Sequence, residues 1–269
     1  MTVTIATRPR TILDTGALTV EISDDPADID AVQRLRYRVF AAEPGFSDAI
    51  GDAATGLDAD RFDEFCDHLI VRHHEDGVIG CARLLRSARA VDAGGWYTAT
   101  EFDIGGLREI LSATVEMGRV CVAAGHRQGS TTALMWAALL QYLDDGDHQY
   151  LMGCVSVPLS GIGARGSGLR GVRDTLRDKH SAPWPVYPHH RPQVDGQLLD
   201  DIEPPGAVNL PPLLRAYLRL GARVCGEPAI DEIFDVGDFV TIIDHASGNT
   251  RYLDRLRSAA TRLAPASTV

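Results

Sequence analysis

The sequence predicts an α/β (α+β) fold, and two observations carry that prediction. Short apolar runs typical of strands alternate with segments whose apolar residues recur at helical spacing. In the central part of the chain the order is strand, helix, three strands, helix, strand, which favours a sheet covered by helices. The 269 residues are 45% hydrophobic and 23% charged, a composition that allows an ordinary globular core.

Local signals justify the first elements in order. Residues 17–22 alternate apolar and polar, as in a strand, and Ser23-Asp24-Asp25-Pro26 then starts a helix. A charged turn at Glu75-Asp76-Gly77 joins the next two strand candidates into a hairpin. The expected elements from this hairpin onward are strands at 68–72 and 78–85, a short helical piece at 104–111, a strand at 114–123, a helix at 130–142 and a strand at 150–157.

No internal repeat is found, so we expect a single domain at 17–249 with a helical insertion at about 158–222. A flexible tail is expected at 1–16 and a C-terminal helix and tail at 250–269. Residues 43–60 form a long loop rich in Gly, Ala and Asp, and such loops often bind ligands. The later elements are expected to be helices at 169–179 and 210–221, strands at 229–234 and 239–243, and a polar helix at 250–263.

Composition excludes several classes of protein. The net charge of -11 argues against nucleic-acid binding, because neutralising phosphates needs a basic face. The longest apolar stretches, such as Ala133–Leu140, are far shorter than the ~20 residues that span a bilayer. The N-terminus lacks an apolar run followed by a cleavage site, so it does not resemble a secretory signal. We therefore expect a cytoplasmic protein.

Cysteine and histidine patterns indicate neither a disulfide framework nor a metal site. The cysteines are odd in number and widely spaced, without a Cys-x-x-Cys pair, which is typical of reduced thiols in a cytoplasm. The pairs His73-His74 and His189-His190 lack a carboxylate–histidine pattern with ligand spacing, so no metal is predicted. The cysteines are Cys66, Cys81, Cys121, Cys154 and Cys225.

Six strings of the sequence, in order, resemble the ornithine N-acyltransferases of ornithine-lipid synthesis. They are LRYRVF from Leu35, DRFDEFCDHLIV from Asp60, GCARLL from Gly80, GGWYTATEFD from Gly94, VEMGRVCV from Val115 and YLRLGARV from Tyr217. This branch of the GNAT superfamily uses acyl-acyl carrier protein. The resemblance implies a GNAT-like three-layer sandwich, with a mixed central sheet, a bulged fourth strand and a helical insertion before the C-terminal strands.

A subset of these strings is also similar to the acyl-homoserine-lactone synthases and the N-acyl amino acid synthases. Those groups share an arginine and a phenylalanine on the first helix, an Asp in an F-D pair, an arginine on the next strand and a Glu-x-x-Arg. The resemblance implies catalytic roles for two residues and substrate-binding roles for four. The catalytic pair is Glu116 and Arg119, and the substrate-binding residues are Arg36, Phe40, Asp63 and Arg83.

Glu116 is the candidate general base. Aminolysis of a thioester needs a neutral amine, a group that takes up its proton, and donors facing the oxyanion. A carboxylate beside apolar Val115 and Met117 is expected to have a raised pKa, which suits proton uptake near neutrality. The alternative is a structural ion pair of Glu116 with Arg119.

The spacing of Glu116 and Arg119 predicts a β-bulge. Residues three apart on a flat strand point to opposite faces, so both reach one face only if the strand bulges between them, plausibly at Gly118. An unbroken ladder across Gly118 would contradict this prediction.

The arginines and Asp63 suit an amino-acid acceptor. The guanidinium groups of Arg36, Arg83 and Arg119 are suited to binding its carboxylate. Asp63 is suited either to capturing a cationic amine or to capping its loop. Each arginine has the alternative of a plain surface position.

The loop before the helix at 130–142 indicates which acyl donor the protein uses. CoA-dependent GNATs carry R-x-x-G-x-G/A there, whose amides bind pyrophosphate. Here Arg127 is present, but Ser130 and Thr132 replace the glycines, which fits an acyl-phosphopantetheine thioester on acyl carrier protein better than acyl-CoA. Ser130 has the alternative role of a helix cap. No permanently bound cofactor is expected.

A basic cluster in the insertion is the expected docking surface for the carrier protein, which is acidic as the resemblance implies. Arg170, Arg173 and Arg177 share a face at helical spacing, although any solvated helix carries charges. The cluster consists of Arg165, Arg170, Arg173, Arg177 and Lys179.

The leading hypothesis is transfer of a (3-hydroxy)acyl chain to the α-amine of ornithine, or of lysine, giving a lyso-ornithine-lipid-type product. Because that product is amphipathic, peripheral contact with the inner membrane surface is also expected. The alternatives are an N-acyl amino acid or acyl-homoserine-lactone synthase, a CoA-dependent GNAT acting on a small amine, and a catalytically silent GNAT-like binding protein.

Overall fold

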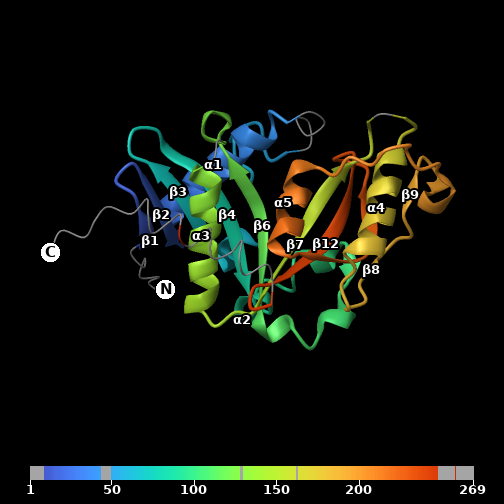
Figure 1. Ribbon diagram of the computed structural model, residues 1–269. Coiled ribbons are helices and arrows are strands. Elements are labelled where there is room, and N and C mark those ends of the chain that lie inside the picture. The colour runs from blue at the N-terminus through green and yellow to red at the C-terminus, as the bar shows by residue number, and fades with distance from the viewer. Residues whose placement is uncertain (1–8, 44–49, 128–129, 162, 248–257, 259–269) are drawn as a thin grey trace. The chain divides into compact units, whose positions relative to one another are not determined.

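The computed structural model describes residues 9–43, 50–127, 130–161, 163–247 and 258. The chain divides into two compact units, and each unit has its own strands and helices (Figure 1). The first unit comprises Met1–Gly94, Val115–His148 and Thr250–Val269, and the second comprises Gly95–Thr114 and Gln149–Asn249.

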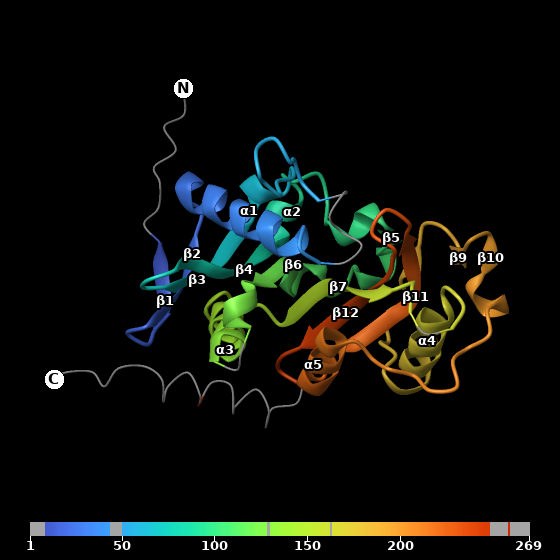
Figure 2. The ribbon, with the colours of Figure 1, turned by 90° about the horizontal axis from the view of Figure 1, so that it is seen from above.

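The first unit is an antiparallel sheet with a helix on each face. Its strand order is β1-β2-β3-β4-β6. Helices α1 (Pro26–Phe40) and α3 (Ser130–Asp145) cover opposite faces of this sheet, and α2 (Ser87–Ala90) follows β4 (Figure 2). The strands are β1 (Arg10–Asp14), β2 (Leu18–Ser23), β3 (Asp67–His73), β4 (Gly77–Arg86) and β6 (Thr114–Val122).

Local sequence explains how α1 is positioned. Asp25 caps its N-terminus by accepting a hydrogen bond from the Ala27 amide at 2.8 Å, and Pro26 occupies the first turn. One face of α1 then buries Val32 and Leu35 in a hydrophobic cluster with residues of β3, β4 and β6. This packing fixes the helix against the strands that carry the candidate site.

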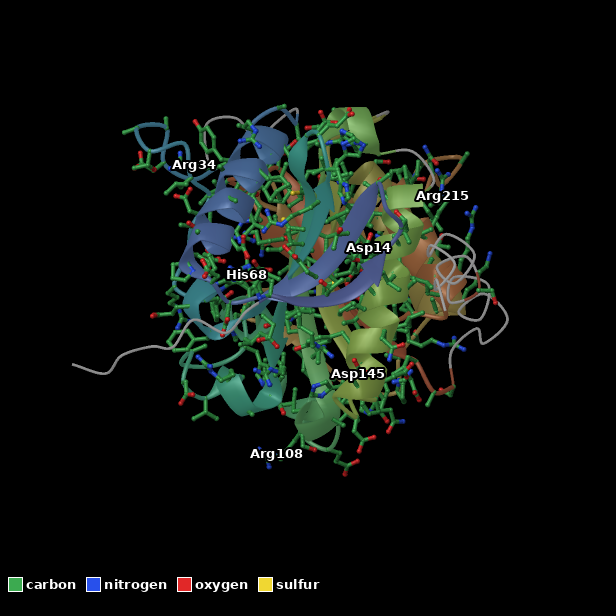
Figure 3. All side chains as sticks on the ribbon, turned by 90° about the vertical axis from the view of Figure 1, so that its left-hand side faces the viewer. Asp14, Arg34, His68, Arg108, Asp145 and Arg215 are labelled. Atoms are coloured by element: carbon green, nitrogen blue, oxygen red, sulfur yellow. The ribbon has the colours of Figure 1, made fainter. Side chains whose placement is uncertain are left out.

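The N-terminal expectation was wrong at one point, because residues 10–14 form strand β1 rather than a flexible tail. Arg10 at the start of β1 forms an ion pair with Asp145 at the end of α3, with Nη1 and Oδ2 2.7 Å apart. Asp145 is visible at that end of the helix in Figure 3.

The second unit has a shorter antiparallel sheet in the order β7-β12-β11. Its strands are β7 (Tyr150–Pro158), β11 (Arg223–Asp231) and β12 (Val236–Asp244). Helices α4 (Ser167–Lys179) and α5 (Pro212–Leu220) lie on one face of it (Figure 2). Among the described residues no helix is long and apolar enough to cross a membrane.

Short elements complete the second unit. The helical piece expected at 104–111 is instead two 3-10 turns, η3 (Gly105–Leu107) and η4 (Leu111–Ala113). Two-residue strands pair as β5 (Phe102–Asp103) with β8 (Tyr187–Pro188) and as β9 (Gln193–Val194) with β10 (Gln197–Leu198). The second unit also has the 3-10 turns η2 (Thr98–Thr100) and η6 (Leu199–Asp201), and the first unit has η1 (Asp63–Phe65) and η5 (Ala124–His126).

The sequence placed the start of β11 six residues too late. The Gly-Glu-Pro at 226–228 is typical of a turn, yet Gly226 takes φ +66° and the register shifts between Cys225 and Ala229. The strand therefore bulges at this point and continues. The polar helix expected at 250–263 lies outside the described residues, apart from residue 258.

Candidate active site

Three arginines and three aspartates of the first unit form a closed ring of ion pairs. Each arginine bridges two aspartates, and each aspartate bridges two arginines. The guanidinium groups come from α1, β4 and β6, and the carboxylates all come from the loop before β3. In order around the ring the members are Arg36, Asp63, Arg83, Asp60, Arg119 and Asp58.

Distances show which contacts are tightest. Arg36 holds Asp63 in a bidentate pair, with both nitrogen–oxygen distances 2.8 Å, and its Nε lies 2.9 Å from Asp58 Oδ2. Arg83 Nη1 lies 2.5 Å from Asp60 Oδ1 and 3.0 Å from Asp63 Oδ1. Arg119 makes the longest contacts, 3.3 Å to Asp58 and 3.2 Å to Asp60.

The ring has a buried end and an accessible end. The side chain of Arg36 is 1% exposed, and Asp63 and Arg83 are also buried. At the other end, the side chains of Arg119 and Asp60 are 27% and 25% exposed. The Arg119–Asp60 pair is therefore the part of the ring that solvent reaches.

Electrostatics keep the buried end charged. Burial alone raises the pKa of Asp63, but the hydrogen bonds and charges of Arg36 and Arg83 outweigh it and hold this pKa well below its usual range. Burial likewise opposes the charge on Arg83, and the neighbouring Asp60 and Asp63 raise the pKa of Arg83 above its ordinary value. The buried end is thus a fixed, fully ionised scaffold.

A β-bulge in β6 brings Arg119 to this ring. Gly118 is paired with Arg83 and Cys121 with Cys81, so Arg119 and Val120 together face a single residue of β4. Arg119 adopts φ +52°, in the left-handed region. The predicted bulge between Glu116 and Arg119 is therefore present, centred one residue beyond the predicted Gly118.

Glu116 lies on the same face of β6 as the ring. It is two residues before Gly118, and Gly118 is the direct partner of Arg83, so side-chain alternation puts Glu116 and Arg83 on one face. Glu116 is buried. A buried carboxylate on this face of the sheet is a candidate general base.

Two other buried groups border the ring without being nucleophiles. Burial, with help from the charges of Asp63 and Glu116, raises the pKa of Cys66 to about 12, which keeps it a thiol. Burial lowers the pKa of His68, whose Nε2 lies 3.0 Å from the carbonyl oxygen of Asp63. Since a carbonyl only accepts, the neutral imidazole donates this bond and holds the loop.

The structure thus brings together four of the predicted residues, Arg36, Asp63, Arg83 and Arg119, with Glu116 on the same face. Phe40 instead packs against the hydrophobic cluster below α1. Direct binding of the acceptor carboxylate by Arg36 does not fit its burial, because all three of its guanidinium nitrogens already donate within the protein.

The sequence reasoning missed Asp58 and Asp60. Both lie in or beside the loop expected to bind ligands, and together with Asp63 they place three carboxylates within six residues. One signal could have found them: these three carboxylates equal in number the three predicted arginines, which suggests that they pair with one another.

The thioester-arm loop is only partly described, because residues 128–129 and the side chain of Ser130 lie outside the described residues. Arg127 Nη2 lies 2.7 Å from Glu43 Oε1, and its Nε donates to the carbonyl oxygen of Val122 at 3.1 Å. Thr132 is exposed on the first turn of α3. Arg127 is thus held by Glu43 and the β6 end, and the choice of acyl donor stays a prediction.

The predicted docking arginines lie on the second unit, and one prediction among them was wrong. Arg173 is 2% exposed and bonded to carboxylates from three directions, so it cannot meet a partner. Arg165 and Arg170 are paired and half-buried, and the exposed members are Lys179 and Arg177, which pairs with Asp174. The carboxylates around Arg173 are Asp174, Asp200 and Glu227.

Comparison with known proteins identifies the fold and the family. The family described as Acetyltransferase (GNAT) domain matches residues 35–137, which span the ring and Glu116. The solved structure of a CoA-dependent acyl-homoserine lactone synthase, BjaI, with SAM and isopentyl-CoA has the same fold, with a TM-score of 0.50 at 13% identity, covering 88% of this chain and 83% of that one. Fold and site together define a GNAT-type N-acyltransferase.

Curated relatives narrow the class. An L-ornithine N(alpha)-acyltransferase of Brucella abortus is 32% identical over 259 residues, covering 92% of this chain and 91% of the relative. Another from Rhodobacter capsulatus is 32% identical over 234 residues, covering 84% of this chain and 89% of the relative. The chain belongs to the family of L-ornithine N(alpha)-acyltransferases, as the resemblance implied.

Proposed function

We propose that this enzyme transfers a (3-hydroxy)acyl chain from acyl-acyl carrier protein to the α-amine of ornithine, giving a lyso-ornithine-lipid-type product. The names of the relatives support ornithine as the acceptor. Within the structure, the observation that carries the proposal is the accessible Arg119–Asp60 pair at one end of a buried ion-pair ring, on the face that holds Glu116.

The charges of the site suit a dibasic amino acid. Three guanidinium groups face the carboxylates of Asp58, Asp60, Asp63 and Glu116, so three positive and four negative charges leave one net negative charge. Ornithine with a neutral α-amine carries a carboxylate and a side-chain ammonium. Arg119 is suited to the carboxylate and Asp60 to an ammonium, because each is solvent-accessible and each already binds a group of that charge.

The proposed reaction is a general-base aminolysis. Glu116 takes a proton from the α-amine as its nitrogen attacks the thioester carbonyl carbon. The carbon–nitrogen bond forms, the carbon–sulfur bond breaks, and the proton leaves with the thiol of the phosphopantetheine arm. The ring holds Arg119 in place throughout, so little reorganisation is needed as charge develops.

The replaced glycines of the thioester-arm loop support a carrier-protein donor. Ser130 and Thr132 stand where a pyrophosphate-binding loop has glycines, and Arg127 is paired with Glu43. A cavity of about 310 Å³ beside Arg127, lined also by Leu35, Val39 and Ala123, offers apolar walls suited to an alkyl-like arm. Arg177 and Lys179 remain the proposed contacts for the acidic carrier protein.

The test is a transfer assay on the purified protein. Acyl-acyl carrier protein and acyl-CoA are each supplied with ornithine, lysine or S-adenosylmethionine, and products are identified by mass spectrometry. We expect N-acylornithine from the carrier-protein donor. A lactone product would identify a homoserine-lactone synthase instead, and preference for acyl-CoA would overturn the donor assignment.

A glutamine substitution separates catalysis from binding. Glu116→Gln should lower transfer by about 10²-fold or more, the usual contribution of a general base, while the circular dichroism spectrum is retained. Glu109→Gln, on an exposed residue, is the matched control and should leave transfer unchanged. Binding of acyl-acyl carrier protein without transfer in the wild type would instead support a silent binding protein.

A further inference from the structure

Two cysteines face each other across β4 and β6, next to the bulge. Cys81 and Cys121 are direct partners in the strand register, and their Sγ atoms lie 3.6 Å apart. Both are free thiols and buried, at 2% and 6% exposure. The Cys81 thiol also contacts the carbonyl oxygen of Arg119 at 3.7 Å, so this pair touches the backbone that presents the active-site arginine.

The geometry is close to that of a disulfide. Paired residues of antiparallel strands have Cα atoms about 4.5 to 5.5 Å apart, inside the range that disulfides tolerate. The sulfur atoms of Cys81 and Cys121 must approach by about 1.5 Å to reach the ~2.05 Å bond. Side-chain rotation and a small strand shift supply that movement.

The cysteines lie one layer of side chains away from a cavity. This cavity of about 310 Å³ shares Leu35 and Val39 with the hydrophobic cluster that contains both cysteines. Ala123 lines the cavity and packs against the same cluster. Because hydrogen peroxide is little larger than water, we expect side-chain motion in this single layer to admit it.

We propose that Cys81 and Cys121 are a peroxide-sensitive dithiol whose oxidation to a disulfide lowers acyl transfer by shifting Arg119. This effect on activity rests on the proposed function, but the oxidation itself does not. The ion-pair ring contains neither cysteine, so we expect the reaction not to need the reduced pair.

The oxidation balances with a hydroperoxide as the oxidant. One sulfur attacks a peroxide oxygen, so that a sulfur–oxygen bond forms, the oxygen–oxygen bond breaks and water leaves. The second sulfur then attacks the resulting sulfenic acid, forming the sulfur–sulfur bond and releasing a second water. Two thiols and one hydrogen peroxide give one disulfide and two waters.

The reaction is expected to be slow at neutral pH. The hydrogen bond with Cys81 and then burial raise the pKa of Cys121, and the charges of Arg36 and Asp58 also face it. Because the thiolate is the nucleophile, a raised pKa lowers the reactive fraction. Oxidation therefore responds to sustained peroxide rather than to a brief pulse.

The link to activity is mechanical. A disulfide draws β4 and β6 together beside the bulge, where Cys81 already contacts the Arg119 backbone. Since Arg119 makes the longest contacts of the ring, at 3.2 and 3.3 Å, a small displacement breaks them first.

The experiment treats the full-length protein with hydrogen peroxide, removes the oxidant and blocks free thiols under denaturing conditions. Peptide mass spectrometry should show a mass lower by two hydrogen atoms, with a Cys81–Cys121 crosslink. Acyl transfer should fall by about tenfold or more, as expected for misplaced groups, and dithiothreitol should restore it. Absence of the crosslink, or sulfinic acid alone, would overturn the inference.

Variants separate the pair from the other cysteines. Cys121→Ser should keep basal transfer and lose peroxide sensitivity, whereas Cys154→Ser, a half-buried cysteine outside the pair, should remain sensitive. If Cys121→Ser does not fold, Cys81→Ala carries the same test. If the wild type forms the crosslink and its transfer activity is unchanged, the proposed effect on Arg119 is wrong. The crosslink itself can be measured whether or not the acceptor is ornithine.

Discussion

Arg83 on β4 lies directly opposite Gly118 on β6, and a Cβ atom added at Gly118 would meet no heavy atom within 4 Å. This open space borders the ion-pair ring, on the face of β6 that Glu116 shares. The absence of a side chain at Gly118 therefore leaves room next to the base and the guanidinium groups.

Filling this space should block the reaction without unfolding the protein. Gly118→Ala should weaken transfer slightly and Gly118→Leu by at least about tenfold, because a larger side chain occupies the volume that a reacting group needs. Thermal melting of Gly118→Ala should change little, since its added Cβ meets no heavy atom within 4 Å. Gly168→Ala, at another open position, is the control, and full activity of Gly118→Leu would show that the space is not used.

Arg119→Lys tests whether the fork of the guanidinium matters. A lysine ammonium is a point charge and cannot bridge Asp58 and Asp60 while also binding a carboxylate. We expect kcat/KM for ornithine to fall by about 10²-fold, with the fold retained, because this end of the ring is accessible. Arg34→Lys on the outer side of α1 (Figure 3) is the matched control, and equal losses in both variants would contradict the assignment.

Asp63→Asn tests the buried end of the ring. The substitution leaves Arg36 and Arg83 buried with a lost counter-charge, a change that typically costs about 3 to 5 kcal/mol. The free energy of unfolding at pH 7, from urea titration, should fall by that order. A loss below about 1 kcal/mol would show that the ring is not a stabilising unit.

At acidic pH the free energies of unfolding of wild type and Asp63→Asn should become more similar. The folded-state pKa of Asp63 is depressed, so its stabilisation is complete above the unfolded-state pKa and is lost as pH falls towards the folded-state value. The gap between wild type and Asp63→Asn should therefore shrink below about pH 4. A gap that is constant between pH 7 and pH 3 would contradict the ionic origin of the effect.

Ionisation of Asp238, in the second unit, should change stability in the opposite direction: it should destabilise the folded state. Burial raises its pKa to about 6, with a contribution from the charge of Asp231, although Ser156 donates a 2.6 Å hydrogen bond to it. Its Glu101 and Asp231 neighbours place carboxylate oxygens within 4.8 Å of its own. The charged form therefore destabilises the folded state, and this cost grows as pH rises through the window from the unfolded to the folded pKa.

Asp238→Asn should accordingly stabilise the protein above pH 6, by on the order of 2 kcal/mol, and have little effect near pH 4. The asparagine oxygen still accepts from Ser156, so the packing is preserved. Melting temperatures measured from pH 4 to pH 8 provide the check. A variant that melts lower than wild type at pH 8 would show that the carboxylate is needed in its charged form.

Local signals predicted the framework of the first unit well. The Asp25 cap, the turn at 75–77 and the apolar alternation are encoded by neighbouring residues, and α1, β3 and β4 follow them closely. The bulge was predicted from a functional requirement rather than a propensity. Local propensity could not predict that the bulge is centred at Arg119, because arginine rarely adopts a positive φ.

The remaining errors share a cause, since they concern contacts between distant segments. Asp58 and Asp60 become ion-pair partners only when the loop folds over Arg83 and Arg119. The helical spacing of Arg173 indicated a solvated face, but Arg173 is buried and pairs with Asp200 and Glu227 from other segments as well as with the adjacent Asp174. Spacing along one segment does not show what another segment will cover.

At Arg119, with its left-handed backbone, the demands of thermal stability and of the proposed activity conflict. An L-residue there carries a conformational cost of roughly 1 to 2 kcal/mol that glycine does not. Glycine at this position would relieve that cost but lose the ion pairs to Asp58 and Asp60, and under the proposed function it would also lower transfer, so selection for survival at high temperature alone can act against activity here. A screen for hardier catalysts must measure product, or keep this codon fixed.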